Sequence, residues 1–192
     1  MHSNPHLRPV EVGDICLLIE PHPQADITLL RGRQQELQTQ HGGSLISHVH
    51  LSCQRFAAAE EGQLTDFVDS IRHEMKALMP FPLHAIALQT LPVPALHSTM
   101  LKWKIDISTT LLQFNAMVAE ASRQSGLTTL YRAGFTSNLV SALRDLPMAQ
   151  PDAQLQDYHL PYHLFDAAKI VLSQIHGPNH FRILATLFEE HR

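Results

Sequence analysis

The segment His48-Val49-His50-Leu51-Ser52-Cys53-Gln54-Arg55-Phe56 decides how the whole chain is interpreted, because its polar and apolar residues alternate. Successive side chains of a β-strand point to opposite faces, so His48, His50 and Ser52 would share one face. The apolar residues between them would form the buried face of a half-buried strand. The polar face would place an imidazole, which exchanges a proton near neutral pH, two residues from a hydroxyl donor.

The residues before this segment predict a strand followed by a helix. Residues 14–20 form a short, continuous apolar run that is typical of a buried central strand. Residues 25–40 have the apolar spacing of an amphipathic helix, which would end at the glycine pair 42–43. We expect residues 1–13 to be a flexible lead-in, and residues 14–192 to form one domain with two lobes.

The middle of the chain contains the clearest periodic patterns. Residues 62–79 repeat apolar side chains at helical spacing, and the range 84–91 alternates as a strand does. A second strand is predicted over 99–106, followed by a helix over 109–124 with Ser108 as its N-cap.

The last third of the chain predicts a strand, a short helix, a loop and two closing strands. Residues 127–132 are rich in β-branched and aromatic side chains, which favours a strand, and 136–146 suits a short helix. Residues 148–157 are polar and predict a surface loop, while 165–174 and 181–189 predict the closing strands. We therefore predict an α+β fold with two lobes, each an antiparallel sheet with helices packed outside.

Composition narrows the class of protein. The chain has 192 residues and 44% hydrophobic residues, which is typical of a globular domain rather than a disordered chain. The formal charge of −4 gives no general attraction to nucleic acid, and no apolar run is long enough to span a membrane. The start lacks a signal peptide, and Cys16 and Cys53 lie in apolar runs as reduced thiols would, so we expect a cytoplasmic protein.

The order of elements, with His50-Leu51-Ser52 on the second strand, resembles the two-histidine (2H) phosphoesterase superfamily, which includes 2′-5′ RNA ligases and cyclic phosphodiesterases. That family has two His-x-Thr/Ser strands, one per lobe, facing each other across a groove. The resemblance covers about residues 14–190 and is strongest at the first motif. At the second motif the best match in this chain is Leu127-Thr128-Thr129-Leu130-Tyr131-Arg132, where Leu127 takes the place of the second histidine.

The resemblance implies roles for particular residues. His50 would be the acid or base, and the hydroxyls of Ser52 and Thr129 would bind the phosphate. Four further residues would contact the substrate: Arg132, Tyr131, Arg55 and His48. The family mechanism needs no metal and no cofactor. A leucine transfers no proton, so the degenerate second motif removes one of the two acid–base groups.

Three other readings of the histidines remain open at the sequence level. His48 and His50 could be two ligands of a metal on one strand face, although the spacing supplies no third ligand. His97, in His97-Ser98-Thr99, or His163 could replace the missing second histidine.

Two functions follow from these residues. The first is a 2H-like phosphoesterase acting on 2′,3′-cyclic or 2′-5′ phosphodiesters of nucleotides or RNA ends. The second is a catalytically impaired relative that binds a nucleotide or phosphate ligand in the same groove. A shared fold with no phosphate site is the third alternative.

Overall fold

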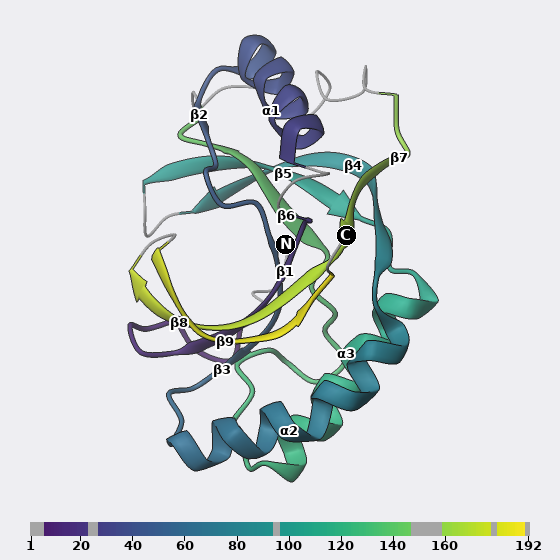
Figure 1. Ribbon diagram of the computed structural model, residues 1–192. Helices are drawn as coiled ribbons and strands as arrows, with labels where there is room; N and C mark the ends of the chain where they lie inside the picture. The colour runs from purple at the N-terminus through teal and green to yellow at the C-terminus, as the bar shows by residue number, and fades with distance from the viewer. Residues whose placement is uncertain (1–5, 23–26, 94–96, 147–158, 178–179, 191–192) are drawn as a thin grey trace.

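A computed structural model describes residues 6–22, 27–93, 97–146, 159–177 and 180–190. Within these ranges three helices lie outside one strongly curled antiparallel sheet (Figure 1). The helices are α1 (Ile27–His41), α2 (Glu61–Leu78) and α3 (Thr109–Gln124). The strands are β1 (Ile15–Glu20), β2 (Ser44–Leu45), β3 (Leu51–Phe56), β4 (Phe81–Val93), β5 (Ser98–Ile105), β6 (Leu139–Arg144), β7 (Tyr162–Ala167), β8 (Lys169–Gly177) and β9 (His180–Glu189).

The sheet consists of two arms of four strands that meet in its middle. Its strand order is β7-β4-β5-β6-β3-β1-β8-β9, with the short β2 paired to β6. We call β3, β1, β8 and β9 the first arm, and β6, β5, β4 and β7 the second arm. The arms are joined where Leu51 of β3 pairs with Val140 of β6. The predicted α+β fold is therefore confirmed, and its two lobes are the two arms of one curled sheet.

The helices cover the outer faces of the two arms. Helix α1 packs against β2 and β6, where buried Gln34 donates hydrogen bonds to the carbonyl oxygens of Ile46 (3.1 Å) and Ala142 (2.9 Å). Helices α2 and α3 pack against each other on the side of the first arm, with α2 contacting β9 and α3 contacting β3 (Figure 1). The concave side between the arms is thereby left for a cavity.

Sequence signals explain where these helices start and which face they bury. In α2, Phe67, Ile71 and Met75 recur every fourth residue and are completely buried. Helix α3 begins after Ser108, whose hydroxyl accepts a hydrogen bond from the amide of Leu111 at 3.2 Å. Both helices agree with the predicted ranges within one residue at each end.

Four predicted elements differ from the structure. Residues 136–146 contain strand β6 rather than a helix, because this segment pairs with both β5 and β3 and tertiary pairing outweighs local propensity. Residues 127–132 form only single bridges, because they pair alternately with β3 and with the amino-terminal segment. The predicted strand 45–56 is divided into β2 and β3, and the predicted strand 165–174 spans the end of β7 and the start of β8. The loop predicted at 148–157 lies outside the described residues.

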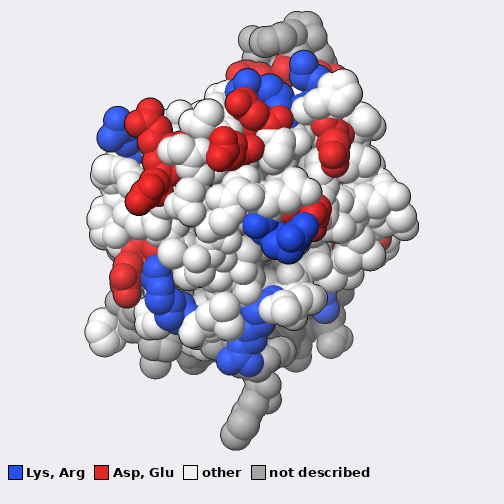
Figure 2. All heavy atoms as spheres, turned by 90° about the horizontal axis from the view of Figure 1, so that it is seen from below, with Lys and Arg blue, Asp and Glu red and all other residues white. Residues whose placement is uncertain are grey.

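None of the three helices is both long and apolar enough to cross a membrane. Acidic and basic side chains are interspersed over the face below α2 and α3 (Figure 2). That face therefore offers no broad basic surface for a long nucleic acid.

Candidate functional site

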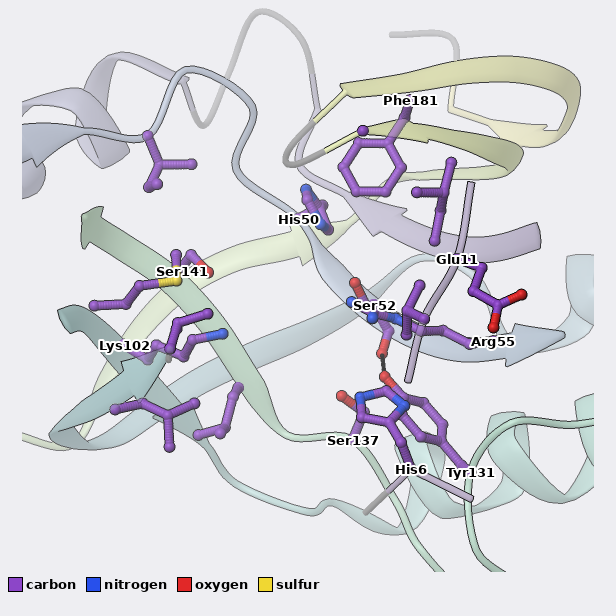
Figure 3. A pocket seen from close by; sticks show the side chains of 18 of the residues that line it. His6, Glu11, His50, Ser52, Arg55, Lys102, Tyr131, Ser137, Ser141 and Phe181 are labelled. Carbon is purple, nitrogen blue, oxygen red and sulfur yellow. Dashed lines mark hydrogen bonds between the residues drawn. The ribbon is translucent and has the colours of Figure 1, made fainter. Parts of the chain in front are cut away.

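A cavity of about 480 Å³ lies between the two arms, on the concave side of the sheet. Its walls come from β3 and β6 at the junction, from β5 beside them, and from the β8–β9 hairpin (Figure 3). The amino-terminal segment, residues 6–14, forms one side of the cavity. This volume is within the usual range for pockets that bind small molecules, about 300–1,000 Å³.

The junction of the arms places matching residues of β3 and β6 in this cavity. Leu51 and Val140, which pair across the junction, are completely buried. Their neighbours along the two strands point to the opposite face and line the cavity: His50 and Ser52 around Leu51, and Leu139 and Ser141 around Val140. The two antiparallel strands thus relate His50 to Leu139 and Ser52 to Ser141 by an approximate two-fold axis.

This register identifies the true counterpart of the first motif. It is Leu139-Val140-Ser141, and not the segment beginning at Leu127. Leu127 is 6% exposed and packs in the hydrophobic core, while Thr129 bridges Phe56 and does not line the cavity. In both assignments a leucine occupies the position of the second histidine. Local patterns favour a helix over 136–146 and so do not reveal this counterpart, although the hydroxyl inside the apolar run 139–143 is a signal for it.

His50 lies directly before β3 and is set up as a neutral base. Its Nδ1–H donates a hydrogen bond to the carbonyl oxygen of His48 at 3.0 Å, which leaves Nε2 to accept a proton. Its ring stands edge-on to Phe181, with centroids 5.2 Å apart. Burial lowers the pKa of His50 to about 3, and electrostatic interactions with His48 and Arg55 act in the same direction. At neutral pH His50 is therefore uncharged and has no proton to donate from Nε2.

His48 lines a neighbouring recess and does not line the main cavity. Its Nε2 lies 2.8 Å from Oε1 of Glu20, and its ring centroid lies 4.9 Å from that of His50. Together with Arg144 it lines a smaller recess of about 90 Å³ beside the cavity. Within the ranges that the structure describes, no group of three or more His, Cys, Asp or Glu side chains is arranged to hold a metal ion.

Two cationic side chains line the cavity from opposite arms. They are Arg55 of β3 and Lys102 of β5, and neither takes part in any ion pair among the described residues. The Nε atom of Arg55 is buried without a hydrogen-bond partner in the described part of the chain. Its neighbour Cys16 stays an uncharged thiol, because burial raises the pKa of that thiol. Arg55 and Lys102 are half-buried, and cations partly withdrawn from water are stabilised by an opposite charge, so the cavity is suited to an anion.

Burial also lowers the pKa of Lys102, to about 8, and the positive charge of Arg55 contributes to this shift. In the register of β5 and β6, Lys102 pairs with Ser141. A titratable ammonium therefore stands beside the hydroxyl of the second arm.

Aromatic side chains form the wall below Ser52. Tyr131 donates a hydrogen bond from its hydroxyl to the backbone oxygen of Ser52 at 3.4 Å (Figure 3). Its ring lies 4.8 Å from that of His6 and 4.9 Å from that of Phe135, centroid to centroid. Burial raises the pKa of Tyr131 to about 12, so its hydroxyl stays protonated. Arg132, its neighbour along the chain, is exposed and does not line the cavity.

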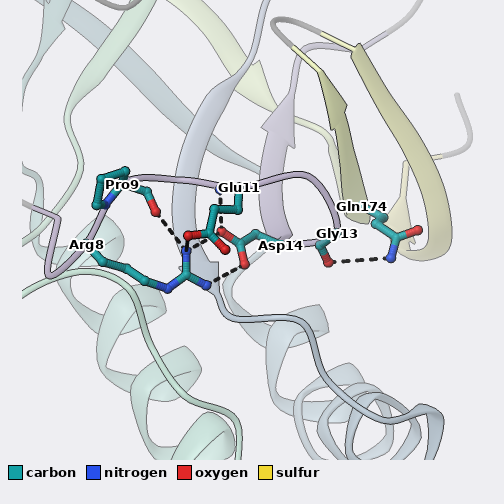
Figure 4. Close-up of polar contacts among 6 residues, drawn as sticks. All are labelled: Arg8, Pro9, Glu11, Gly13, Asp14 and Gln174. Atoms are coloured by element: carbon teal, nitrogen blue, oxygen red, sulfur yellow. Dashed lines mark hydrogen bonds and ion pairs between the residues drawn. The ribbon is translucent and has the colours of Figure 1, made fainter.

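The amino-terminal segment is fastened to the start of β1. Arg8 makes two hydrogen bonds to the carboxylate of Asp14, at 2.9 Å from Nη1 and 2.7 Å from Nη2 (Figure 4). The amide of Leu7 also bonds to the carbonyl oxygen of Leu130 at 2.9 Å. These contacts position His6 and Glu11 in the cavity wall.

The two histidines considered as substitutes lie elsewhere. His97 is exposed in the connection between β4 and β5. His163 lies on β7, where its Nε2 is 2.8 Å from Oδ1 of Asp166. Neither histidine lines the cavity.

Comparison with known proteins identifies the fold. No protein-family model and no curated protein matches the sequence significantly. Among solved structures, the apo crystal structure of Escherichia coli LigT is 13% identical, with a TM-score of 0.56 over 92% of this chain and 97% of LigT. A crystal structure titled simply as a phosphoesterase is 12% identical, with a TM-score of 0.57 over 94% of this chain and 100% of the other. The chain therefore shares the fold of these two structures, in agreement with the α+β architecture predicted from the order of its elements.

Proposed function

We propose that this protein is a phosphoesterase that hydrolyses 2′,3′-cyclic or 2′-5′ phosphodiesters of nucleotides or RNA ends. One observation carries the proposal: the cavity between the arms combines a neutral histidine and two serine hydroxyls with two cations that lack ion pairs among the described residues. The fold shared with the structure titled as a phosphoesterase supports the same reaction class.

Four side chains of the cavity have a chemical task in this reaction. Ser52 and Ser141 donate hydrogen bonds to the phosphate oxygens from the two arms, and Arg55 balances the negative charge. His50 accepts a proton at Nε2 from the attacking water. Charge that develops on phosphorus-bound oxygens in the transition state is stabilised by donors already in place.

The surrounding wall suits the organic part of such a substrate. Tyr131, Phe135 and Phe181 offer aromatic surface next to the polar groups, on which a base can stack. The free thiols of Cys16 and Cys53 are consistent with the reducing cytoplasm, where we place this activity.

A second candidate function is binding without hydrolysis. Leu139 favours it, because this side chain transfers no proton at the position that mirrors His50. In that case the cavity would hold a nucleotide or a phosphate monoester as a bound ligand.

The test is hydrolysis of a panel of 2′,3′-cyclic nucleotides and 2′-5′ dinucleotides by the wild type and by His50→Ala. We expect turnover by the wild type and a decrease of roughly 10²–10⁴-fold in the variant. His97→Ala is the matched control, because it removes an exposed histidine outside the cavity, and it should keep full activity.

Absence of wild-type turnover above the His50→Ala background would overturn the hydrolytic proposal. Calorimetric titration with adenosine 2′-monophosphate then decides the second candidate. Saturable binding that weakens in Arg55→Met supports a ligand-binding protein, and no binding rejects it.

A further inference from the structure

We propose that Lys102 is the proton donor to the leaving oxygen, and that it replaces the histidine missing from the second arm. This inference rests on the proposed phosphoesterase function. It concerns a residue on β5, one strand away from the position at which a second histidine would lie.

The position of Lys102 is the first argument. It pairs with Ser141 in the register of β5 and β6, and its side chain extends into the cavity (Figure 3). Ser141 is the hydroxyl that mirrors Ser52 of the first arm. A phosphate held between these two hydroxyls therefore has His50 on one side and Lys102 on the other.

The protonation states supply the second argument. Burial lowers the pKa of Lys102 to about 8, which keeps the ammonium charged at neutral pH yet able to release a proton. Burial lowers the pKa of His50 much further, so that His50 is unprotonated, and the charge of Lys102 contributes to that shift. Two titratable groups with separated pKa values in one site are assigned as base and acid.

The other titratable groups that face the cavity do not serve as the acid. They are His6, Glu11, Arg55 and Tyr131. Burial lowers the pKa of His6 to about 4, so that its ring is neutral at neutral pH. The tyrosine holds its proton up to a pKa of about 12, and an arginine does not release one. Glu11 is exposed and forms an ion pair with Arg8 at 3.8 Å.

The resulting step balances without any further reactant. A bond forms between a water oxygen and phosphorus, and the proton of that water moves to Nε2 of His50. The bond between phosphorus and a ribose oxygen breaks, and that oxygen receives the proton from Nζ of Lys102. The product is a phosphate monoester with a free ribose hydroxyl. The protonated His50 and the neutral Lys102 then return to their starting states by exchange with solvent.

Substituting Lys102 tests this role when two leaving groups are compared. Lys102→Arg keeps the positive charge but holds its proton too tightly to act as an acid. We expect it to reduce kcat for adenosine 2′,3′-cyclic monophosphate by roughly 10²-fold or more. For bis(p-nitrophenyl) phosphate, whose leaving group departs without protonation, we expect a change of less than about threefold.

Two further measurements separate catalysis from structure. Lys104→Met is the matched control, because Lys104 lies on the same strand but is exposed and outside the cavity. It should leave both substrates unaffected. In the wild type, kcat for the cyclic nucleotide should fall as the pH rises past the pKa of Lys102, and this alkaline decline should be absent in Lys102→Arg.

The outcomes distinguish this inference from the proposed function. Equal losses on both substrates in Lys102→Arg would show that Lys102 only binds phosphate, and would overturn the inference. A wild-type rate in Lys102→Arg would also overturn it, while the phosphoesterase function stands. No turnover of either substrate by the wild type would reject the hydrolytic function and the acid role together.

Discussion

The two arms of the sheet present the same backbone to the cavity but different chemistry. The first arm contributes His50 and Ser52, and the second contributes Leu139 and Ser141 at the mirrored positions. Both arms keep a hydroxyl, whereas only the first keeps an imidazole. In the proposed reaction, hydroxyl donors from both arms bind the phosphate, and a titratable group on each side transfers a proton. The comparison separates the parts of the site that bind from the parts that react.

The largest effect is expected from restoring the symmetry of the arms. Leu139→His in a Lys102→Met background returns an imidazole to the mirrored position, and we expect kcat for the cyclic nucleotide to rise roughly 10²-fold over Lys102→Met alone. Leu139→Asn in the same background is polar but does not titrate, so it should give no increase. Equal rates in these two double variants would contradict the mirrored geometry.

A smaller and symmetric effect is expected from the two hydroxyls. Ser52→Ala and Ser141→Ala each remove one hydrogen bond to a charged phosphate, which contributes about 1.5 kcal/mol or more. Each variant should therefore bind adenosine 2′-monophosphate roughly tenfold less tightly by calorimetry. A loss in only one of the two variants would mean that the phosphate contacts a single arm.

The pH dependence of binding should depend on the second arm. A bound phosphate favours the charged ammonium and so raises the pKa of Lys102 above its free value of about 8. The affinity for the phosphate ligand is therefore highest below the pKa of Lys102 in the free protein. It decreases as the pH rises through the pKa of Lys102 in the complex. A pKa rise of one unit corresponds to about tenfold in affinity. Lys102→Arg should show no such decrease in affinity between about pH 7 and about pH 10. The same pH dependence of affinity in the wild type and in Lys102→Arg would show that Lys102 does not cause it.

The smallest effect on ligand affinity is expected from residues that the sequence predicts in the site but that lie outside the cavity. Thr129→Val and Arg132→Ala alter side chains outside the cavity, so each should change ligand affinity by less than about twofold. Arg55→Met, inside the cavity, is the matched comparison and should weaken binding clearly. A loss in Arg132→Ala comparable to that in Arg55→Met would show that the ligand reaches beyond the walls described.

Local patterns predicted the first arm better than the second. The alternation in 48–56 identified the face shared by His50 and Ser52, because polar and apolar residues alternate along strand β3 and so mark its two faces. Strand β6 has Leu139, Ala142 and Leu143, which are equally compatible with a helix. Its strand state comes from pairing on both edges, which is a long-range effect that local propensity does not contain.

The contribution of Lys102 was missed for a similar reason. The predicted strand over 99–106 was correct, and Lys102 was visible in it as one of two nearly equivalent lysines. The pairing of β5 with β6 places Lys102 beside Ser141 and Lys104 beside Leu139, and of these two lysines only Lys102 lines the cavity.

The most direct test of the account is a crystal structure with adenosine 2′-monophosphate bound. The account predicts the phosphate between the arms, with its oxygens at hydrogen-bond distance, about 2.5–3.0 Å, from both Ser52 Oγ and Ser141 Oγ. A phosphate bound elsewhere on the molecule, or an empty cavity at a saturating ligand concentration, would contradict it.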